Sequence, residues 1–243
     1  MTFHYNYTSK IPKSGFVFFL LLIAICYSLM TYVSIKNREL YILLLQEDGP
    51  LENFATVSVL LAALFFFAAY LRHRGTRVNP FYLIFSIALL FLFLEEISWG
   101  QRIFGIETPA LFQDLNAQKE INLHNYSPIY KHINKIAYAG LQFYLVGIVL
   151  LTLIFKKLYS MFIKFQIPIP SPATALLMCA NYFLYHDLFL SLASRFGYHG
   201  KVTVNYVELY EAGIELSLLF FSIECFYRGI TWMSEGEEYC SWL

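Results

Sequence analysis

Charged residues are scarce in this sequence. Asp, Glu, Lys and Arg make up 14% of its 243 residues, whereas 58% are hydrophobic. A soluble domain usually carries about 25% charged residues, so this chain has too few of them to cover a surface that faces water. The composition is typical of an integral membrane protein. The net charge is zero and no block of like charges occurs, so no nucleic-acid partner is predicted.

The motifs of disulfide and zinc scaffolds are also lacking. The four cysteines never occur in CxxC spacing, and the chain contains neither HExxH nor HxxxH. This excludes a disulfide framework and a zinc ribbon. Cys26, Cys179 and Cys225 fall inside apolar runs, which is typical of small buried hydrophobic residues. Internal repeats are absent as well, and we predict a single domain over residues 1–243.

Long apolar runs, in contrast, are abundant. A membrane-spanning helix needs about 20 predominantly apolar residues, and six stretches come close to that length. They predict an all-α integral membrane bundle of about six transmembrane helices, over residues 14–35, 53–71, 80–98, 136–155, 172–193 and 206–228. The first run is too long for a signal peptide and lacks a small-residue cleavage site, so we expect it to be retained.

The connections between these helices differ in charge. The segments "LRHRGTRVNP" (71–80) and "FKKLYSMFIKFQIPIP" (155–170) are basic and contain no acid. Short basic connections favour the cytoplasm, which places both termini there. Most of the 17 acidic residues fall in the other connections or in the adjoining helix ends. We therefore expect an acidic side that faces away from the cytoplasm and a plain basic side.

The third helix carries two acids in "FLFLEEISWGQR" (91–102). Glu95 lies about 22 Å along that helix at 1.5 Å per residue, still below the headgroups. Successive residues on a helix differ by about 100°, so Glu95 and Glu96 cannot face the same partner. We expect Glu95 to form one wall of a polar cavity. Glu96 is expected to contact the loop or another helix.

Two later helices bring polar residues to the same depth. The fifth delivers His186 and Asp187, and the sixth has Glu208, Glu211 and Glu215 on one face. Ionisable groups in a span cost several kcal/mol each, so they normally face the bundle interior, pair, or line a water-filled cavity. The convergence predicts one shared cavity that opens to the acidic side.

The loop after the third helix contains "ETPALFQDLNAQKEINLHN" (107–125). Thr108 followed by Pro109 predicts the start of a short interfacial helix. Asn116, Glu120 and His124 would then repeat on one face, as a lid over the cavity. An amphipathic helix that rests on the membrane surface is the alternative.

These residues favour a membrane-embedded hydrolase or transferase that acts on a lipid or lipid-linked substrate at the non-cytoplasmic face. Glu95 or Glu211 would act as general base, with His186 as a further catalytic group. Zinc-like divalent metals bind His, Glu and Asp, and the metal candidates are His124, His186 and Glu215. The residues assigned to the substrate or the lid are Glu52, Glu96, Ser98, Arg102, Asn116, Glu120, Asp187 and Glu208.

Two other functions and one purely structural role stay open. The same acids could relay protons or bind cations in a transporter or channel component, where Gly213 would permit local unwinding of the sixth helix. The chain could instead be a non-catalytic subunit of a cell-envelope complex, and its protein partners are not predicted. Interhelical hydrogen bonds and ion pairs would explain the polar residues without any active site.

The strings "EDGPLE", "EEISWGQRIFGIETP" and "NAQKEINLHN" resemble the signature of a family of bacterial multi-pass membrane proteins of unknown function. The similarity covers about residues 47–126. It implies a bacterial inner membrane protein and carries no activity. The chain is more distantly similar to alkaline-ceramidase-like membrane hydrolases, which hold a metal among helix ends. Those proteins have seven helices and an HxxxH pair, which this sequence lacks.

Overall fold

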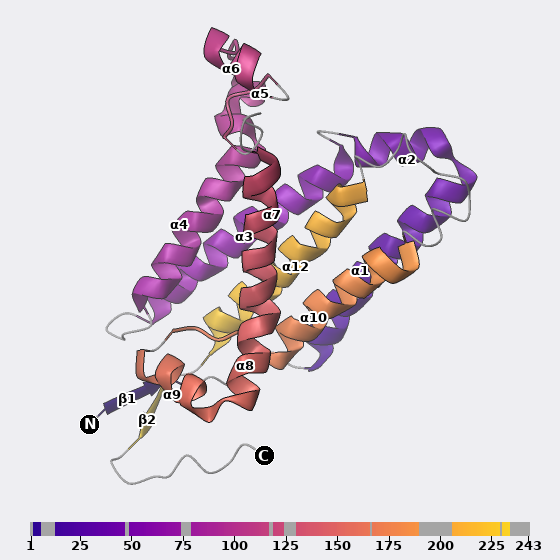
Figure 1. The fold of residues 1–243 in the computed structure, drawn as a ribbon. Coiled ribbons are helices and arrows are strands. Elements are labelled where there is room, and N and C mark those ends of the chain that lie inside the picture. The colour runs from indigo at the N-terminus through magenta and orange to yellow at the C-terminus, as the bar shows by residue number, and fades with distance from the viewer. Residues whose placement is uncertain are drawn as a thin grey trace.

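The computed structural model describes residues 2–5, 13–46, 49–73, 79–116, 119–123, 130–165, 167–189, 206–228 and 230–233. The described chain is a bundle of long helices, with one pair of four-residue strands beyond it (Figure 1). The helices of the first half are α1 (Lys13–Lys36), α2 (Arg38–Leu45), α3 (Pro50–Arg72), α4 (Asn79–Glu96), η1 (Ser98–Gly100), α5 (Gln101–Phe104) and α6 (Ala110–Leu115). Those of the second half are α7 (Tyr130–Gln142), η2 (Phe143–Gly147), α8 (Ile148–Ile154), α9 (Lys156–Phe165), α10 (Pro172–Phe183), η3 (Leu184–Phe189) and α12 (Tyr206–Tyr227).

The outer surface of the bundle is apolar. Large hydrophobic side chains on α1 are more than half exposed, among them Phe18, Ile25 and Leu29. Continuous apolar surface of this kind is what a bilayer covers. Three helical stretches are long and apolar enough to cross a membrane, namely Lys13–Lys36, Arg38–Arg72 and Ile136–Ile154. The predicted helical class is therefore confirmed, and the chain has the character of a membrane protein.

Every one of the six predicted stretches is helical where the structure describes it, but some boundaries differ. The third helix ends at Glu96 instead of residue 98. The fourth begins earlier, at Tyr130, and continues through the π-helical turn η2 into α8. The fifth continues from α10 into a second π-helical turn, η3, which ends at Phe189. Residues 190–193 lie outside the described part of the chain.

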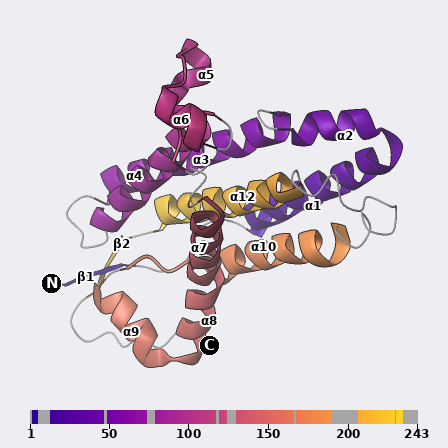
Figure 2. The same ribbon diagram turned by 45° about the horizontal axis from the view of Figure 1, so that its top comes forward.

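Helix α12 is the centre of the bundle. It packs against α3, α10 and α1, and α3 packs in turn against α4. Figure 2 shows α12 between α3 and α10. Nearly every α12 residue from Leu209 to Cys225 is buried or half-buried, and Phe221 meets Phe66 and Phe85 in an aromatic cluster. A helix that is apolar over most of its surface is expected at such a central position.

Local sequence fixes where several helices begin. Asn37 caps α2 by accepting a hydrogen bond from the Leu40 amide at 3.0 Å. Ser171 does the same for α10, from the Thr174 amide at 3.2 Å, and Pro172 follows at the first helical position. These are the residue types that helix starts favour.

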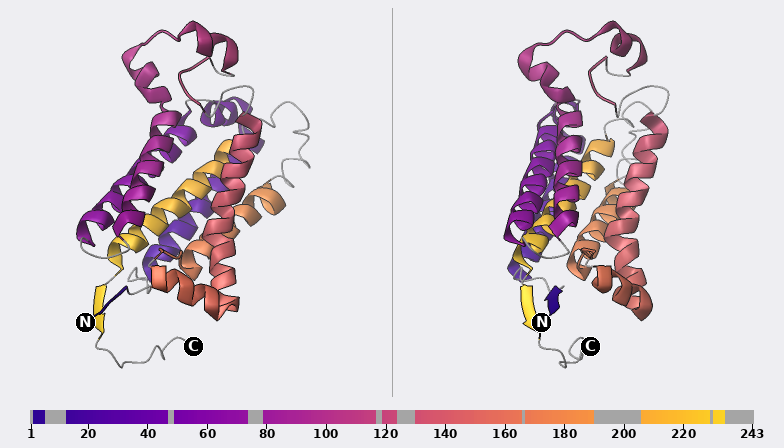
Figure 3. Two further views of the ribbon diagram at one scale, coloured as in Figure 1. Left: turned by 60° about the vertical axis from the view of Figure 1, so that its left-hand side comes forward. Right: turned by 90° about the vertical axis from the view of Figure 1, so that its left-hand side faces the viewer.

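The two ends of the bundle differ in what extends beyond them (Figure 3). At one end, residues 97–116 and 119–123 form a folded extension of α4 that contains η1, α5 and α6, and we call it the cap. At the other end, strands β1 (Thr2–Tyr5) and β2 (Ile230–Met233) pair antiparallel, with Thr2 opposite Met233. The end that bears the cap also holds the first turns of α3 and α12, and we call it the acid end.

Candidate functional site

Carboxylates from three helices meet at the acid end. Glu52 lies in the first turn of α3, and Glu96 is the last residue of α4. On α12, Glu208, Glu211 and Glu215 are spaced i, i+3, i+7 on one face, which spans about 10 Å at 1.5 Å per residue. We call these five residues the carboxylate group. All five are half-buried, so each keeps some accessible surface.

The members of the carboxylate group are electrostatic neighbours of one another. Glu215 interacts with the charges of Glu96 and Glu211, and also with those of Glu208 and Glu52. Glu96 reaches this group because it shares the inward face of α4 with Tyr82 and Leu89. Both of those side chains are buried. An α4 acid, Glu96, thus lies near the α12 acids.

Two members have well-defined surroundings. The Tyr138 hydroxyl of α7 donates a hydrogen bond to Glu211 Oε1. Glu215 Oε2 is buried and has no hydrogen-bond partner among the described residues. A buried polar oxygen without a partner is costly, and in a native protein it indicates a site for water, a proton or a ligand.

Glu95 faces the cap. Its side chain is 2% exposed. One carboxylate oxygen accepts from Trp99 Nε1 at 2.7 Å and the other from the Leu123 amide at 2.5 Å. We expected Glu95 to form the cavity wall, but in the structure Glu96 is the α4 acid beside Glu211 and Glu215. Both Glu95 oxygens are used in holding the loop.

The reason for this difference is the turn that follows α4. Ser98, Trp99 and Gly100 all have positive φ, at 48°, 55° and 78°. This left-handed run ends the helix at once and folds the chain back over Glu95. Side-chain rings support the turn, because Trp99 meets Phe91 edge-on with centroids 5.5 Å apart.

Hydrogen bonds between polar side chains hold the cap together. Ser98 donates to Glu120 and accepts from Asn122. Asn116 Nδ2 donates to Asn122 Oδ1 at 2.7 Å, and Gln101 accepts from the Ile121 amide at 2.6 Å. The predicted lid residues Ser98, Asn116 and Glu120 are therefore brought together, but in the interior of the cap.

The predicted helical face of the loop is wrong. Helix α6 begins after Pro109, which takes the N-cap position we assigned to Thr108, and it ends at Leu115. Asn116 is already extended, with φ −98° and ψ 133°, so Asn116 and Glu120 cannot repeat along one helix. The Thr108 hydroxyl instead donates to the Lys119 carbonyl at 2.7 Å, which closes the loop. His124 lies outside the described residues.

His186 and Asp187 are both exposed and belong to the π-helical turn η3. The His186 ring lies 4.3 Å from the Tyr182 ring and 5.9 Å from the Tyr210 ring. Tyr210 precedes Glu211 on α12, so His186 packs beside the neighbouring face of that helix. Successive residues point about 100° apart. The face of α12 that His186 contacts is therefore adjacent to the face that carries the acids.

Metal binding stays a prediction. Among the residues that the structure describes, no three His, Cys, Asp or Glu side chains are grouped so that they could hold a metal ion. The candidate ligands His186 and Glu215 belong to different surroundings, and His124 is not described. The side chain of Arg102, a predicted substrate or lid residue on α5, also lies outside the described part.

Sequence reasoning missed two polar contacts at the acid end. Tyr138 binds Glu211, and Gln142 donates to the Tyr210 hydroxyl. Tyr138 and Gln142 are four residues apart and share one face of α7. Their spacing inside an apolar run was the signal that could have identified them.

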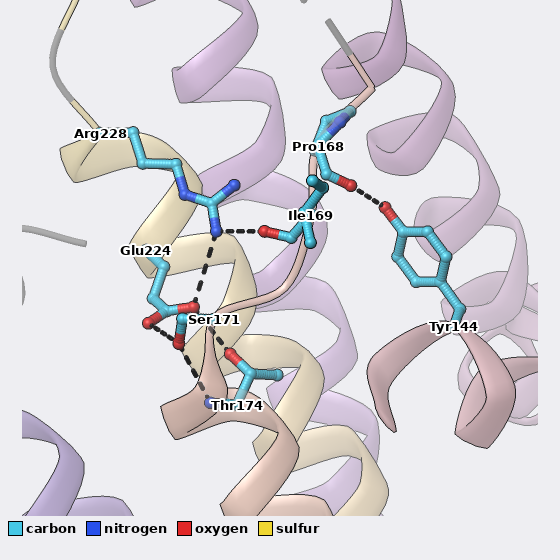
Figure 4. A network of polar contacts seen from close by, with 7 residues as sticks. All are labelled: Tyr144, Pro168, Ile169, Ser171, Thr174, Glu224 and Arg228. Atoms are coloured by element: carbon cyan, nitrogen blue, oxygen red, sulfur yellow. Dashed lines mark hydrogen bonds and ion pairs between the residues drawn. The ribbon is translucent and has the colours of Figure 1, made fainter. Parts of the chain in front are cut away.

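A second missed cluster lies at the opposite end of α12, around Glu224 (Figure 4). Glu224 and Arg228 are fully buried and form an ion pair at 4.0 Å. The Glu224 carboxylate accepts from the Ser171 hydroxyl at 2.5 Å and from the Thr174 hydroxyl at 2.7 Å. Arg228 also donates to the Ile169 carbonyl. This network ties the start of α10 to the end of α12.

Comparison with known proteins adds no further information on this geometry. The chain matches no protein-family model, no curated protein and no solved structure. The resemblance of residues 47–126 to a bacterial membrane protein family stays a prediction. In the structure, the strings that carry it supply the cap and two members of the carboxylate group, Glu52 and Glu96.

The hydrogen bonds to Glu95 predict that this residue stabilises the cap. Glu95→Ala removes the acceptor of two N–H groups, and hydrogen bonds to a charged group contribute about 1.5–3 kcal/mol. We expect the amide hydrogens of residues 98–123 to exchange with solvent faster, because the cap opens locally. The increase in exchange rate should correspond to the free energy lost with these two hydrogen bonds. The matched control is Glu107→Ala, since Glu107 is an exposed acid of the same cap. Equal exchange in both variants would contradict the proposed role.

Proposed function

We propose that this protein is a membrane-embedded hydrolase or transferase that acts on a lipid or lipid-linked substrate at the acid end. The observation that carries the proposal is the buried Oε2 of Glu215, which has no hydrogen-bond partner among the described residues, beside the half-buried Glu96 and Glu211. Carboxylates that share protons supply an acid and a base within one site. An apolar bundle surrounds them, which suits a substrate that arrives through the bilayer.

The proposed reaction uses two carboxyl groups in opposite protonation states. The ionised one accepts a proton from water as the water oxygen bonds to the carbonyl or phosphoryl centre. The protonated one gives its proton to the leaving oxygen as the old bond breaks. In a transfer reaction an acceptor hydroxyl takes the place of water. Tyr138 acts as a positioning residue, because its hydroxyl holds Glu211.

The distribution of acids along α12 favours an enzyme over a transport path. Below Glu215 the helix is packed with buried apolar residues such as Leu216 and Phe220. The next acid, Glu224, lies about 13 Å further on at 1.5 Å per residue, and its oxygens are bound by Ser171 and Thr174. The hydroxyl of Ser217, between the two acids, donates to its own helix at Gly213. On α12, therefore, no chain of free polar groups leads from Glu215 to Glu224, which a proton path along this helix would need.

The membrane placement belongs to the same proposal. We propose that all six predicted helical stretches cross a bacterial inner membrane. Both termini then lie in the cytoplasm and the acid end lies outside. The basic segments 71–80 and 155–170 support this orientation. A divalent zinc-like metal, with His124, His186 and Glu215 as its candidate ligands, stays a prediction and is one arm of the test.

The test reconstitutes purified protein into vesicles of bacterial total-lipid extract and measures new lipid products by mass spectrometry. Wild-type protein is expected to form a product. Glu96→Gln, Glu211→Gln and Glu215→Gln are each expected to lower the rate about 10²- to 10⁴-fold, the usual contribution of general acid–base catalysis. Glu107→Gln serves as the matched control, because Glu107 is exposed on the cap.

Two other outcomes have distinct meanings. Turnover that is lost with a chelator and restored by zinc would place a metal in the reaction. If the wild type forms no product but Glu215→Gln abolishes proton flux across the vesicle membrane, the protein is a proton-coupled transporter and the proposal is overturned.

A further inference from the structure

The cap presents large apolar side chains outward. Ile103 is 69% exposed, Phe104 76% and Leu111 64%. The rings and branches of Trp99, Ile106 and Leu123 are about half exposed as well. Single exposed hydrophobic residues are ordinary on soluble surfaces, whereas many within one short segment mark an interaction surface.

Several polar residues of the cap are turned inward. Gln101, Asn116 and Asn122 are 7%, 4% and 1% exposed, and each is hydrogen-bonded within the cap. A segment that satisfies several polar groups inside and presents large apolar groups outward suits the boundary between hydrocarbon and headgroups. A water-exposed loop would have the opposite arrangement.

The apolar surface of the cap continues that of the bundle. Helix α4 packs along α3, which belongs to a stretch apolar enough to cross a membrane. The outward face of α4 is a shallow apolar groove lined by Ile84, Ile87, Ala88, Phe91 and Leu92. Trp99 rests edge-on against Phe91 at the end of that groove. Its indole N–H is bonded to Glu95, and interfacial tryptophans likewise combine an apolar ring with a bonded N–H.

We propose that the cap is an interfacial membrane element, which inserts Ile103, Phe104 and Leu111 into the boundary between headgroups and acyl chains. The partner is therefore the lipid surface itself. Exposed polar residues of the cap, such as Glu107 and Asp114, suit this depth because they can reach the headgroups. The inference is independent of any catalytic role of the carboxylate group.

The three tryptophans of the chain make the proposal testable. Trp232→Phe and Trp242→Phe together leave Trp99 as the sole tryptophan, with the cap itself unaltered. A second variant adds Trp99→Phe and Phe104→Trp, which moves the probe to the most exposed large hydrophobic residue of the cap. Both are reconstituted into vesicles whose lipids carry bromine on the acyl chains. The positive control places the sole tryptophan at Ile25, which is 59% exposed on α1.

We expect brominated chains to quench Trp99 and the tryptophan at position 104 as they quench the α1 control, while aqueous iodide has little effect. Quenching by iodide and not by bromine would show that the cap stands in water, and would overturn the proposal. Protection from both quenchers would show that a protein covers the cap and would overturn it too. If dilution of the protein in lipid then restored quenching, that protein would be a second copy of this chain.

Discussion

Arg228→Met is expected to lower the free energy of unfolding by about 3–5 kcal/mol, the cost of breaking a buried ion pair by removing one partner. Arg228 and Glu224 are both fully buried. The substitution leaves the Glu224 carboxylate without its cation in the middle of the bundle. It also removes the donor to the Ile169 carbonyl, so the segment before α10 loses one of its attachments to α12.

Unfolding of the purified protein by denaturing detergent measures this loss. The double variant Glu224→Gln with Arg228→Met removes both charges and is expected to recover part of the stability, because no unpaired ion remains. Arg72→Met is the matched control. Arg72 lies over the Phe226 ring at 5.0 Å but is exposed, so its loss is expected to cost under about 1 kcal/mol. A double variant no more stable than Arg228→Met alone would contradict this account.

The second large effect is expected for Gly213→Ala. A Cβ at Gly213 would lie 1.9 Å from Asn181 Oδ1, so α12 and α10 could not pack as they do. Asn181 is fully buried. It accepts from the Tyr27 hydroxyl at 2.8 Å and donates to the Tyr210 carbonyl at 3.0 Å. Displacing it breaks both bonds in the core, at about 1–3 kcal/mol for each group left unpaired.

Gly140→Ala is the matched control for this substitution. Gly140 is also helical, and a Cβ there would meet nothing within 4 Å. Alanine in that position is expected to stabilise α7 by up to about 1 kcal/mol. A thermal denaturation midpoint that falls for Gly213→Ala and rises for Gly140→Ala is the expected pair of results. If Asn181→Ala were to restore nothing in the Gly213→Ala background, the steric explanation would fail.

Gly213 also illustrates what the sequence could and could not predict. We considered it a point of local unwinding, but α12 runs without a break from Tyr206 to Tyr227. Glycine serves here for the close approach of another helix, which depends on the partner at that level. Helical periodicity carries no information on that partner. The length of the apolar runs does predict the helices. The rise per residue then predicts how far along α12 Glu211 and Glu215 lie.

The two acids at the end of α4 show the same limit. Their depth and their divergence by about 100° follow from helix geometry. Their partners do not, because three consecutive residues of positive φ decide where the loop returns. The hydrogen bonds from Trp99 and Leu123 then assign Glu95 to the cap, which leaves Glu96 for the carboxylate group.

Pairing of β1 with β2 limits how the chain can cross a bilayer. Strands that exchange backbone hydrogen bonds lie on the same side of the membrane, because an open two-stranded pair is not stable in hydrocarbon. We therefore expect the chain between Tyr5 and Ile230 to leave and return to one compartment, which requires an even number of crossings. Three stretches of the described chain meet the length and hydropathy requirement, and three is an odd number, so we predict at least one further crossing beside them. Orientation does not affect this parity, and an epitope inserted beside either strand is expected to be accessible from the same side.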